Sequence, residues 1–152
     1  MAQELKILLN NYKAVEKLIC QKGAILFNET FFTDTYFYQP KGKVLKIVEK
    51  SDGDFINSFQ SKKGMFKVLE DRKITNAPKL KKEYAQQYGV KSILKGKRIY
   101  YKFKYQLIIF NLIDKVGSFL ILIGDNPTKE YIQEELEISE PHYIDVSFDE
   151  LL

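Results

Sequence analysis

The segment at residues 117–124, GSFLILIG, constrains the fold most strongly because neither of its faces is polar. A strand with one solvated face alternates apolar and polar side chains, but positions 119–123 are apolar without interruption. Two explanations fit this pattern. Either the segment is a central strand covered on both sides, or one face has apolar side chains where a related chain would keep polar ones.

Strand and turn patterns recur along most of the chain. Alternating or aromatic-rich segments predict eight strands, at residues 2–9, 25–38, 44–49, 55–63, 66–73, 90–94, 98–112 and 116–123. Asn11, Asn76 and Asn126 are placed to begin three helices, and the tail at 143–152 is expected to return as a short strand or a cap. This order predicts a single α+β domain over residues 1–152, with a mainly antiparallel sheet that can close into a barrel.

Composition narrows the class of protein. A chain of 152 residues without an 18-residue apolar run predicts no membrane span, and its N-terminus lacks the basic start and cleavage site of a signal peptide. Cys20 is the single cysteine and His142 the single histidine, so neither a disulfide framework nor a Cys/His metal site is expected. These features predict a cytoplasmic protein.

The net charge of +4 conceals a strong asymmetry along the chain. Residues 61–105 have a net charge of +11, whereas residues 125–152 have a net charge of −8. The basic middle favours an anionic partner, and the end is an acidic flank. The alternative is a solvated basic face that the acidic tail neutralises.

Strand parity separates basic from core-forming side chains in residues 98–105. The aromatic and aliphatic face reads as core, whereas the other face presents Arg98, Tyr100, Lys102 and Lys104. Several cations projected from neighbouring strands into one partly desolvated concavity would suit a polyphosphate, because closely spaced phosphates match clustered positive charges. Exposed strands also carry lysine as protection against edge pairing, so the pattern has a structural explanation as well.

Short motifs in the first half of the chain carry a resemblance to a known family. Residues 2–6 (AQELK) match E-x-E-x-K except for the first Glu, residues 34–37 (DTYF) match D-T-Y-F in full, and residues 45–48 (LKIV) keep one cation of L-R-I-R. Residues 61–64 (SKKG) are similar to T-Y-K-G, with Lys63 as the lysine, and Lys67 takes the cation of the next motif. In these motifs the chain resembles the CYTH superfamily, the triphosphate tunnel metalloenzymes, which include class IV adenylyl cyclases and thiamine triphosphatases.

The second half of the chain extends the resemblance without a gap. Residues 96–98 (GKR) are similar to the K-x-R motif, and residues 108–123 align with the family pattern I-S-L-D-E-V-E-G-L-G-x-F-V-E-I-E. Ile121 and Ile123 then occupy the positions of two acidic tunnel residues, and Asn111 occupies that of an Asp. The resemblance therefore favours the second explanation for residues 117–124: one face has lost its acids.

The resemblance implies a fold and a chemistry that the chain keeps only in part. It implies an eight-stranded antiparallel barrel with about three flanking helices, around a basic tunnel that holds a triphosphate and a divalent metal. Mg²⁺ and Mn²⁺ prefer oxygen ligands, which isoleucine cannot supply. Glu4 is the carboxylate that still matches, and the neutral Asn111 is a poor substitute for Asp. We therefore expect no metal-dependent catalysis; if the chain is active, Mg²⁺ or Mn²⁺ is the cofactor and Glu4 the catalytic ligand.

The favoured hypothesis is a degenerate CYTH-like tunnel that binds a nucleotide, a triphosphate or a similar small organic anion without turnover. Tyr36 and Tyr100 are expected to stack a base or form the wall, together with Ile121 and Ile123. The cations expected to bind the anion are Lys6, Lys46, Lys63, Lys67, Arg98, Lys102 and Lys104.

Three other functions stay open. The chain could be a protein-interaction scaffold built on a collapsed barrel, an active metal-dependent triphosphatase or adenylyl cyclase-like enzyme, or, least favoured, a nucleic-acid binder. Each candidate residue also has a purely structural explanation. Ile121 and Ile123 could fill a dry core, Asp34 could be a strand-end acid, and Lys6, Lys46 and Arg98 could pair with Glu4, Glu49 or the acidic tail.

Overall fold

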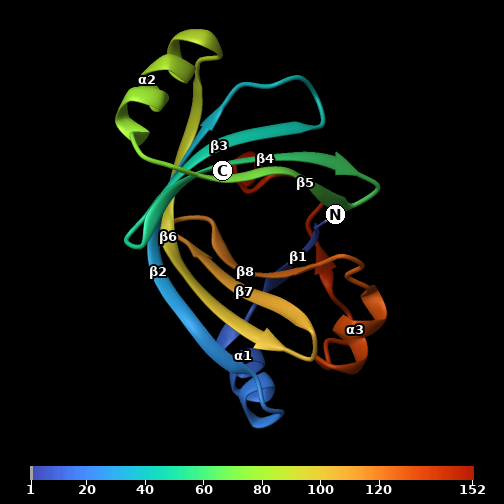
Figure 1. The fold of residues 1–152 in the computed structure, drawn as a ribbon. Coiled ribbons are helices and arrows are strands. Elements are labelled where there is room, and N and C mark those ends of the chain that lie inside the picture. Colours follow the sequence, from blue (N-terminus) through green and yellow to red (C-terminus); the bar gives the residue numbers. More distant parts are fainter. Residues whose placement is uncertain (1) are drawn as a thin grey trace.

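Eight antiparallel strands close into a barrel within residues 2–152, the part of the chain that the computed structural model describes (Figure 1). The sheet order is β5-β4-β3-β2-β6-β7-β8-β1, and pairing of β1 with β5 completes the ring. A two-residue strand, β9, adds to the outer edge of β1. The strands are β1 Gln3–Leu9, β2 Ile25–Phe37, β3 Lys43–Lys50, β4 Gly53–Lys62, β5 Met65–Ile74, β6 Val90–Phe103, β7 Gln106–Ile113, β8 Gly117–Gly124 and β9 His142–Tyr143. The predicted α+β class and antiparallel barrel are confirmed.

Three α-helices lie outside the barrel in the described chain: α1 Tyr12–Gln21, α2 Ala77–Gln87 and α3 Lys129–Glu134 (Figure 1). Asn11 and Asn76 cap the first two as predicted, since their side chains accept hydrogen bonds from the N–H groups of Ala14 and Lys79. The predicted start of the third helix at Asn126 is wrong, because the Thr128 side chain supplies the cap. A short 3-10 helix, η1 Phe148–Leu151, follows β9.

The predicted break between strands at residues 95–97 is also wrong, because β6 runs through it without interruption. Gly96 permits a close backbone approach rather than a turn: a Cβ there would lie 1.9 Å from the carbonyl oxygen of Leu112 on β7. The real turn falls at Lys104 and Tyr105, which adopt φ values of 44° and 66°. Neither residue is a usual turn former, so the sequence pattern concealed the boundary between β6 and β7.

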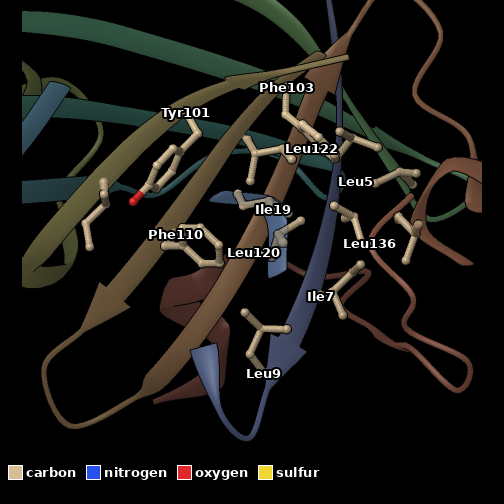
Figure 2. Close-up of a cluster of buried hydrophobic side chains, with 13 residues drawn as sticks. Leu5, Ile7, Leu9, Ile19, Tyr101, Phe103, Phe110, Leu120, Leu122 and Leu136 are labelled. Atoms are coloured by element: carbon tan, nitrogen blue, oxygen red, sulfur yellow. The ribbon is translucent and has the colours of Figure 1, made fainter. Parts of the chain in front are cut away.

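Both faces of β8 are covered, which explains the uninterrupted apolar segment. Leu120 and Leu122 point outward into a cluster with Ile19 of α1 and Leu136 after α3 (Figure 2). Ile121 and Ile123 alternate with them and point into the barrel, where Ile121 belongs to a second cluster with Phe119 and Phe148. The first explanation is therefore confirmed: β8 is sandwiched between a helical layer and the barrel interior.

The barrel interior is filled at one end and hollow beyond it. Phe148 of η1 is 2% exposed and packs against Phe119, with the ring centroids 4.8 Å apart. Lys91, near the start of β6, holds η1 in place through ion pairs of 3.1 Å to both Asp149 and Glu150. The acidic tail thus closes the barrel near the start of β6. No helix within residues 2–152 is long and apolar enough to cross a membrane.

Candidate functional site

A cavity of about 170 Å³ lies inside the barrel, and alternate residues of several strands point into it. Because side chains alternate along a strand, Glu4 and Lys6 of β1 enter together, as do Arg98 and Tyr100 of β6. Four cations line the cavity, namely Lys6, Lys46, Lys50 and Arg98. The apolar part of its wall includes Leu107, Ile109, Ile121 and Ile123 of β7 and β8, together with valine and phenylalanine side chains from other elements.

Asp34 neutralises two of these cations. The Arg98 guanidinium donates to both carboxylate oxygens of Asp34, at 3.3 and 2.6 Å, and the Lys46 ammonium donates to Oδ2 at 2.8 Å. Burial opposes ionisation of Asp34, but Arg98 and Lys46 together hold the pKa of its carboxyl below its ordinary value. Lys46 and Arg98 therefore do pair internally, but with Asp34 rather than with Glu4, Glu49 or the acidic tail.

Lys6 sits in an aromatic cage instead of an ion pair. Its ammonium lies 3.6 Å from the ring centroid of Phe66 and 4.3 Å from that of Phe148. Among residues 2–152, no carboxylate lies within 4.0 Å of it. Burial lowers the pKa of Lys6 to about 7, because removal from water disfavours the charged ammonium more than the nearby Glu4 favours it.

Lys50 is a cavity cation that the sequence prediction missed. Its ammonium lies 4.5 Å from the ring centroid of Phe55 and 3.5 Å from the hydroxyl oxygen of Tyr100, and no ion pair joins it to a described acid. Partial burial lowers the pKa of Lys50. Strand parity could have found it, because Lys46, Val48 and Lys50 share the inward face of β3, but the predicted strand ended one residue too early.

Glu4 is buried, and no cation of residues 2–152 forms an ion pair with it. It is 8% exposed, and burial raises the pKa of its carboxyl more than Lys6, Lys46 and Arg98 lower it. The β1–β8 register places Glu4 opposite Ile123 and Lys6 opposite Ile121. The side chains next to Glu4 on this wall are therefore aliphatic.

The other polar candidates provide few oxygen atoms that could bind a metal in the cavity. Asn111 is fully buried, its Oδ1 accepts from Arg98 Nε at 3.2 Å, and it does not line the cavity. Asp71, which the sequence analysis did not single out, lines the cavity from the exposed rim and accepts from Asn57 at 2.8 Å. Within residues 2–152, no three His, Cys, Asp or Glu side chains group as metal ligands.

This donor set does not fit the divalent metal that the resemblance implies. Mg²⁺ is bound through several oxygens in near-octahedral geometry. The oxygens of Asp34 are occupied by Arg98 and Lys46, and Ile121 and Ile123 offer none. The carboxylates left on the lining are the buried Glu4, whose pKa is raised, and Asp71 at the exposed rim, which accepts a hydrogen bond from Asn57.

Four of the predicted anion-binding cations do not line the central cavity. Lys63 lies in the β4–β5 turn with φ 51°, and together with Lys67 it borders a separate surface depression. Lys102 and Lys104 lie at and just beyond the end of β6, beside an open groove. Of the wall residues predicted, Tyr36, Tyr100, Ile121 and Ile123 all line the cavity.

Comparison with known proteins shows what this fold is similar to. No family model and no curated protein matches the sequence. The PH1012 protein of Pyrococcus horikoshii superposes with a TM-score of 0.88 over 100% of this chain and 99% of its own, at 20% identity. A "putative adenylate cyclase" of Vibrio parahaemolyticus superposes with a TM-score of 0.65 at 17% identity, covering 90% of this chain and 82% of its own.

A third similar structure is the "putative adenylyl cyclase" HpAC1 of Hippeastrum, described as having a dominant triphosphatase activity. It superposes with a TM-score of 0.59 at 11% identity, covering 90% of this chain and 85% of its own. At these identities the likeness concerns the fold. The barrel architecture that the resemblance to the CYTH superfamily implied is thereby confirmed.

Proposed function

We propose that this chain binds a phosphate-containing organic anion inside the barrel and does not turn it over by metal-dependent chemistry. The observation that carries the proposal is the pair of cavity cations Lys6 and Lys50. Both ammonium groups face aromatic rings and neither has an acidic partner within 4.0 Å in the described chain.

A bound phosphate would supply the counter-charge that these lysines lack. Charge-assisted hydrogen bonds are strong in a partly desolvated site, and the anion would favour the protonated form of Lys6. Arg98 and Lys46 are already held by Asp34, so they position the floor of the site and add a positive field. The ion-pair network of Asp34, Arg98 and Lys46 also restricts side-chain motion before the ligand arrives, which lowers the entropic cost of binding.

The absence of turnover is inferred from the donor set beside Lys6. Hydrolysis or cyclisation of a triphosphate relies on metal ions that neutralise the developing phosphoryl charge. Glu4 faces Ile123 across β1–β8, and Ile121 faces Lys6. We therefore expect binding to be independent of Mg²⁺ and Mn²⁺.

The test is a thermal-shift titration with tripolyphosphate, ATP and thiamine triphosphate, each with and without Mg²⁺ or Mn²⁺, alongside a phosphate-release assay. A ligand at about 100 times its Kd adds about 2.7 kcal/mol, a rise in Tm of roughly 5–10 °C at this chain length. A shift without metal and without phosphate release would support the proposal. A shift that requires metal, with turnover abolished in Glu4→Gln, would overturn it in favour of an enzyme.

Charge-removing variants locate the site. Lys50→Gln should weaken binding by at least tenfold, because it removes a cation without breaking an ion pair. The matched control is Lys82→Gln, which removes an exposed lysine on α2 outside the cavity. Equal loss in both variants would mean that binding follows net charge rather than the barrel interior. No shift with any ligand would leave the protein-interaction scaffold as the better hypothesis.

A further inference from the structure

An apolar groove of about 580 Å³ opens beside the β6–β7 turn, at the end of β6 that is opposite the acidic tail. It is formed by the start of β2, the end of β6, the start of β7 and the end of β8. Its apolar lining comprises Ile25, Phe27, Phe103, Tyr105, Leu107 and Ile123. The Ile25 side chain is 65% exposed and that of Phe27 is 47% exposed. Such a grouping of exposed apolar side chains in a concavity is typical of a binding site.

The groove adjoins the central cavity. Leu107 and Ile123 line both spaces and are direct partners in the β7–β8 ladder. Tyr100 of the cavity meets Phe27 of the groove, with ring centroids 5.9 Å apart. One ligand can therefore extend from the basic interior across these side chains into the apolar groove.

From this shared wall, and on the basis of the anion binding proposed above, we infer that the ligand is an amphiphilic phosphate. Its mono- or diphosphate head lies near Lys6 and Lys50, and its hydrocarbon chain lies in the groove along Leu107, Ile123 and Phe27. The volumes support this division. The interior, at about 170 Å³, is smaller than the ~300–1,000 Å³ usual for ligand pockets, so most of an organic ligand must lie in the groove.

The chemistry of the groove favours a hydrocarbon over a nucleoside. A base and a ribose present several donors and acceptors that need partners once they are buried. The neutral polar groups that the groove offers are the Gln106 amide and the Tyr105 hydroxyl, and the other uncharged side chains that line it are apolar. Each nucleoside polar group buried here without a partner would reduce affinity, whereas a methylene chain loses nothing.

Two lysines border the groove and suit an anionic amphiphile. The Lys102 ammonium lies 5.4 Å from the ring centroid of Phe27, and Lys104 pairs with Glu135 at 3.2 Å. Both side chains can lay their methylene stems along apolar surface while the ammonium groups stay in water. Because Glu135 pairs with Lys104, Lys102 supplies the positive charge at the mouth, which favours entry of the phosphate end of a ligand into the cavity beyond.

The experiment compares phosphate monoesters of increasing chain length by isothermal titration calorimetry, below their critical micelle concentrations. The series is methyl, butyl, hexyl and octyl phosphate. Pyrophosphate and AMP serve as references for the phosphate head group, and 1-hexanol serves as the hydrocarbon chain that lacks a phosphate. Full burial of a methylene is worth about a fourfold gain in affinity, from about 0.8 kcal/mol. Allowing for partial burial, we expect hexyl phosphate to bind at least tenfold more tightly than methyl phosphate, and more tightly than AMP.

Two variants test whether the hydrocarbon chain of the ligand lies in the groove. Phe27→Ser should lower the ratio of hexyl phosphate affinity to methyl phosphate affinity and so flatten the dependence on chain length. Phe31→Ser is the matched control, because Phe31 lies on the same strand, is 70% exposed and does not line the groove. It should leave the whole series unchanged, and Lys50→Gln should weaken every phosphate ligand by a similar factor.

The outcomes separate the two proposals. If no phosphate compound binds, the proposed anion site itself is wrong and this inference falls with it. If methyl and hexyl phosphate bind equally, or AMP binds more tightly than hexyl phosphate, the anion site stands and the amphiphilic ligand is wrong. A chain-length dependence that persists in Phe27→Ser, or 1-hexanol binding as tightly as hexyl phosphate, would also overturn it.

Discussion

Replacement of Lys6 by methionine should make the ligand-free protein more stable at neutral and mildly acidic pH. Lys6 is 5% exposed, and burial lowers the pKa of its ammonium from 10.5 to about 7. Each pKa unit corresponds to about 1.36 kcal/mol, so keeping Lys6 charged in the folded state costs at most about 5 kcal/mol. Methionine fills a similar volume without that cost.

Other contacts of Lys6 offset part of this gain. The aromatic cage of Phe66 and Phe148 favours the ammonium by up to about 2 kcal/mol. We therefore expect Lys6→Met to be more stable than the wild type by about 2 kcal/mol at pH 6, or roughly 4–8 °C in Tm.

The pH dependence gives the sharper test. Between about pH 7 and pH 10.5 the unfolded chain keeps a proton on Lys6 that the folded chain has released, so wild-type stability should rise with pH across this window. Lys6→Met should lack this rise, so the stability difference between the two proteins should shift by about 4 kcal/mol in favour of the wild type between pH 6 and pH 10.

The assay is urea unfolding followed by circular dichroism from pH 5.5 to pH 10, with Lys13→Met as the control for an exposed lysine on α1. We expect the control to stay within about 0.5 kcal/mol of the wild type at every pH. If Lys6→Met is less stable than the wild type at pH 6, or if both proteins show the same slope above pH 7, the reasoning on burial of Lys6 is refuted.

Three further predictions concern the barrel interior. Asp34→Asn should cost about 3–5 kcal/mol in chemical denaturation, because it leaves Lys46 and Arg98 buried without a counter-charge, whereas the exposed Asp114→Asn should have little effect. Gly96→Ala should destabilise the protein by more than Gly64→Ala, because a Cβ at Gly96 meets the Leu112 carbonyl oxygen at 1.9 Å. We expect Gly64→Ala to cost about 1 kcal/mol, because Gly64 has open space around it and only a φ of 77° opposes a side chain there. Ile121→Glu should weaken phosphate binding by at least tenfold in calorimetry by adding a negative charge opposite Lys6, and unchanged affinity would exclude this wall from the site.

The local pattern of the sequence determined most of the architecture. Alternation placed Glu4 and Lys6 on one face of β1, the Asn11 and Asn76 caps began two helices, and the Asp52–Gly53 turn ended one strand and began the next. These are properties of residues close together in the chain, so elementary rules of pitch, capping and turn chemistry suffice for them. The order of strands and helices then made an antiparallel barrel the natural closure.

Local rules failed where distant backbone or side chains decide the outcome. Gly96 looked like a strand boundary, but the carbonyl of Leu112 requires a glycine there in the middle of β6. Lys104 and Tyr105 form the real turn without usual turn residues. In both places the constraint comes from the neighbouring strand, which the local pattern does not contain.

The candidate site shows the same division. The sequence alone determined that basic residues alternate with apolar ones and that positions 119–123 are apolar without interruption. Only the tertiary structure decided that Asp34 takes up Lys46 and Arg98, that Lys6 rests on Phe66 and Phe148, and that Lys63 lies outside the cavity. The reason is physical: the charge state and availability of a cation depend on its burial and on which partners the closed barrel brings within a few ångströms, and those partners lie up to 142 positions away in the chain, as for Lys6 and Phe148.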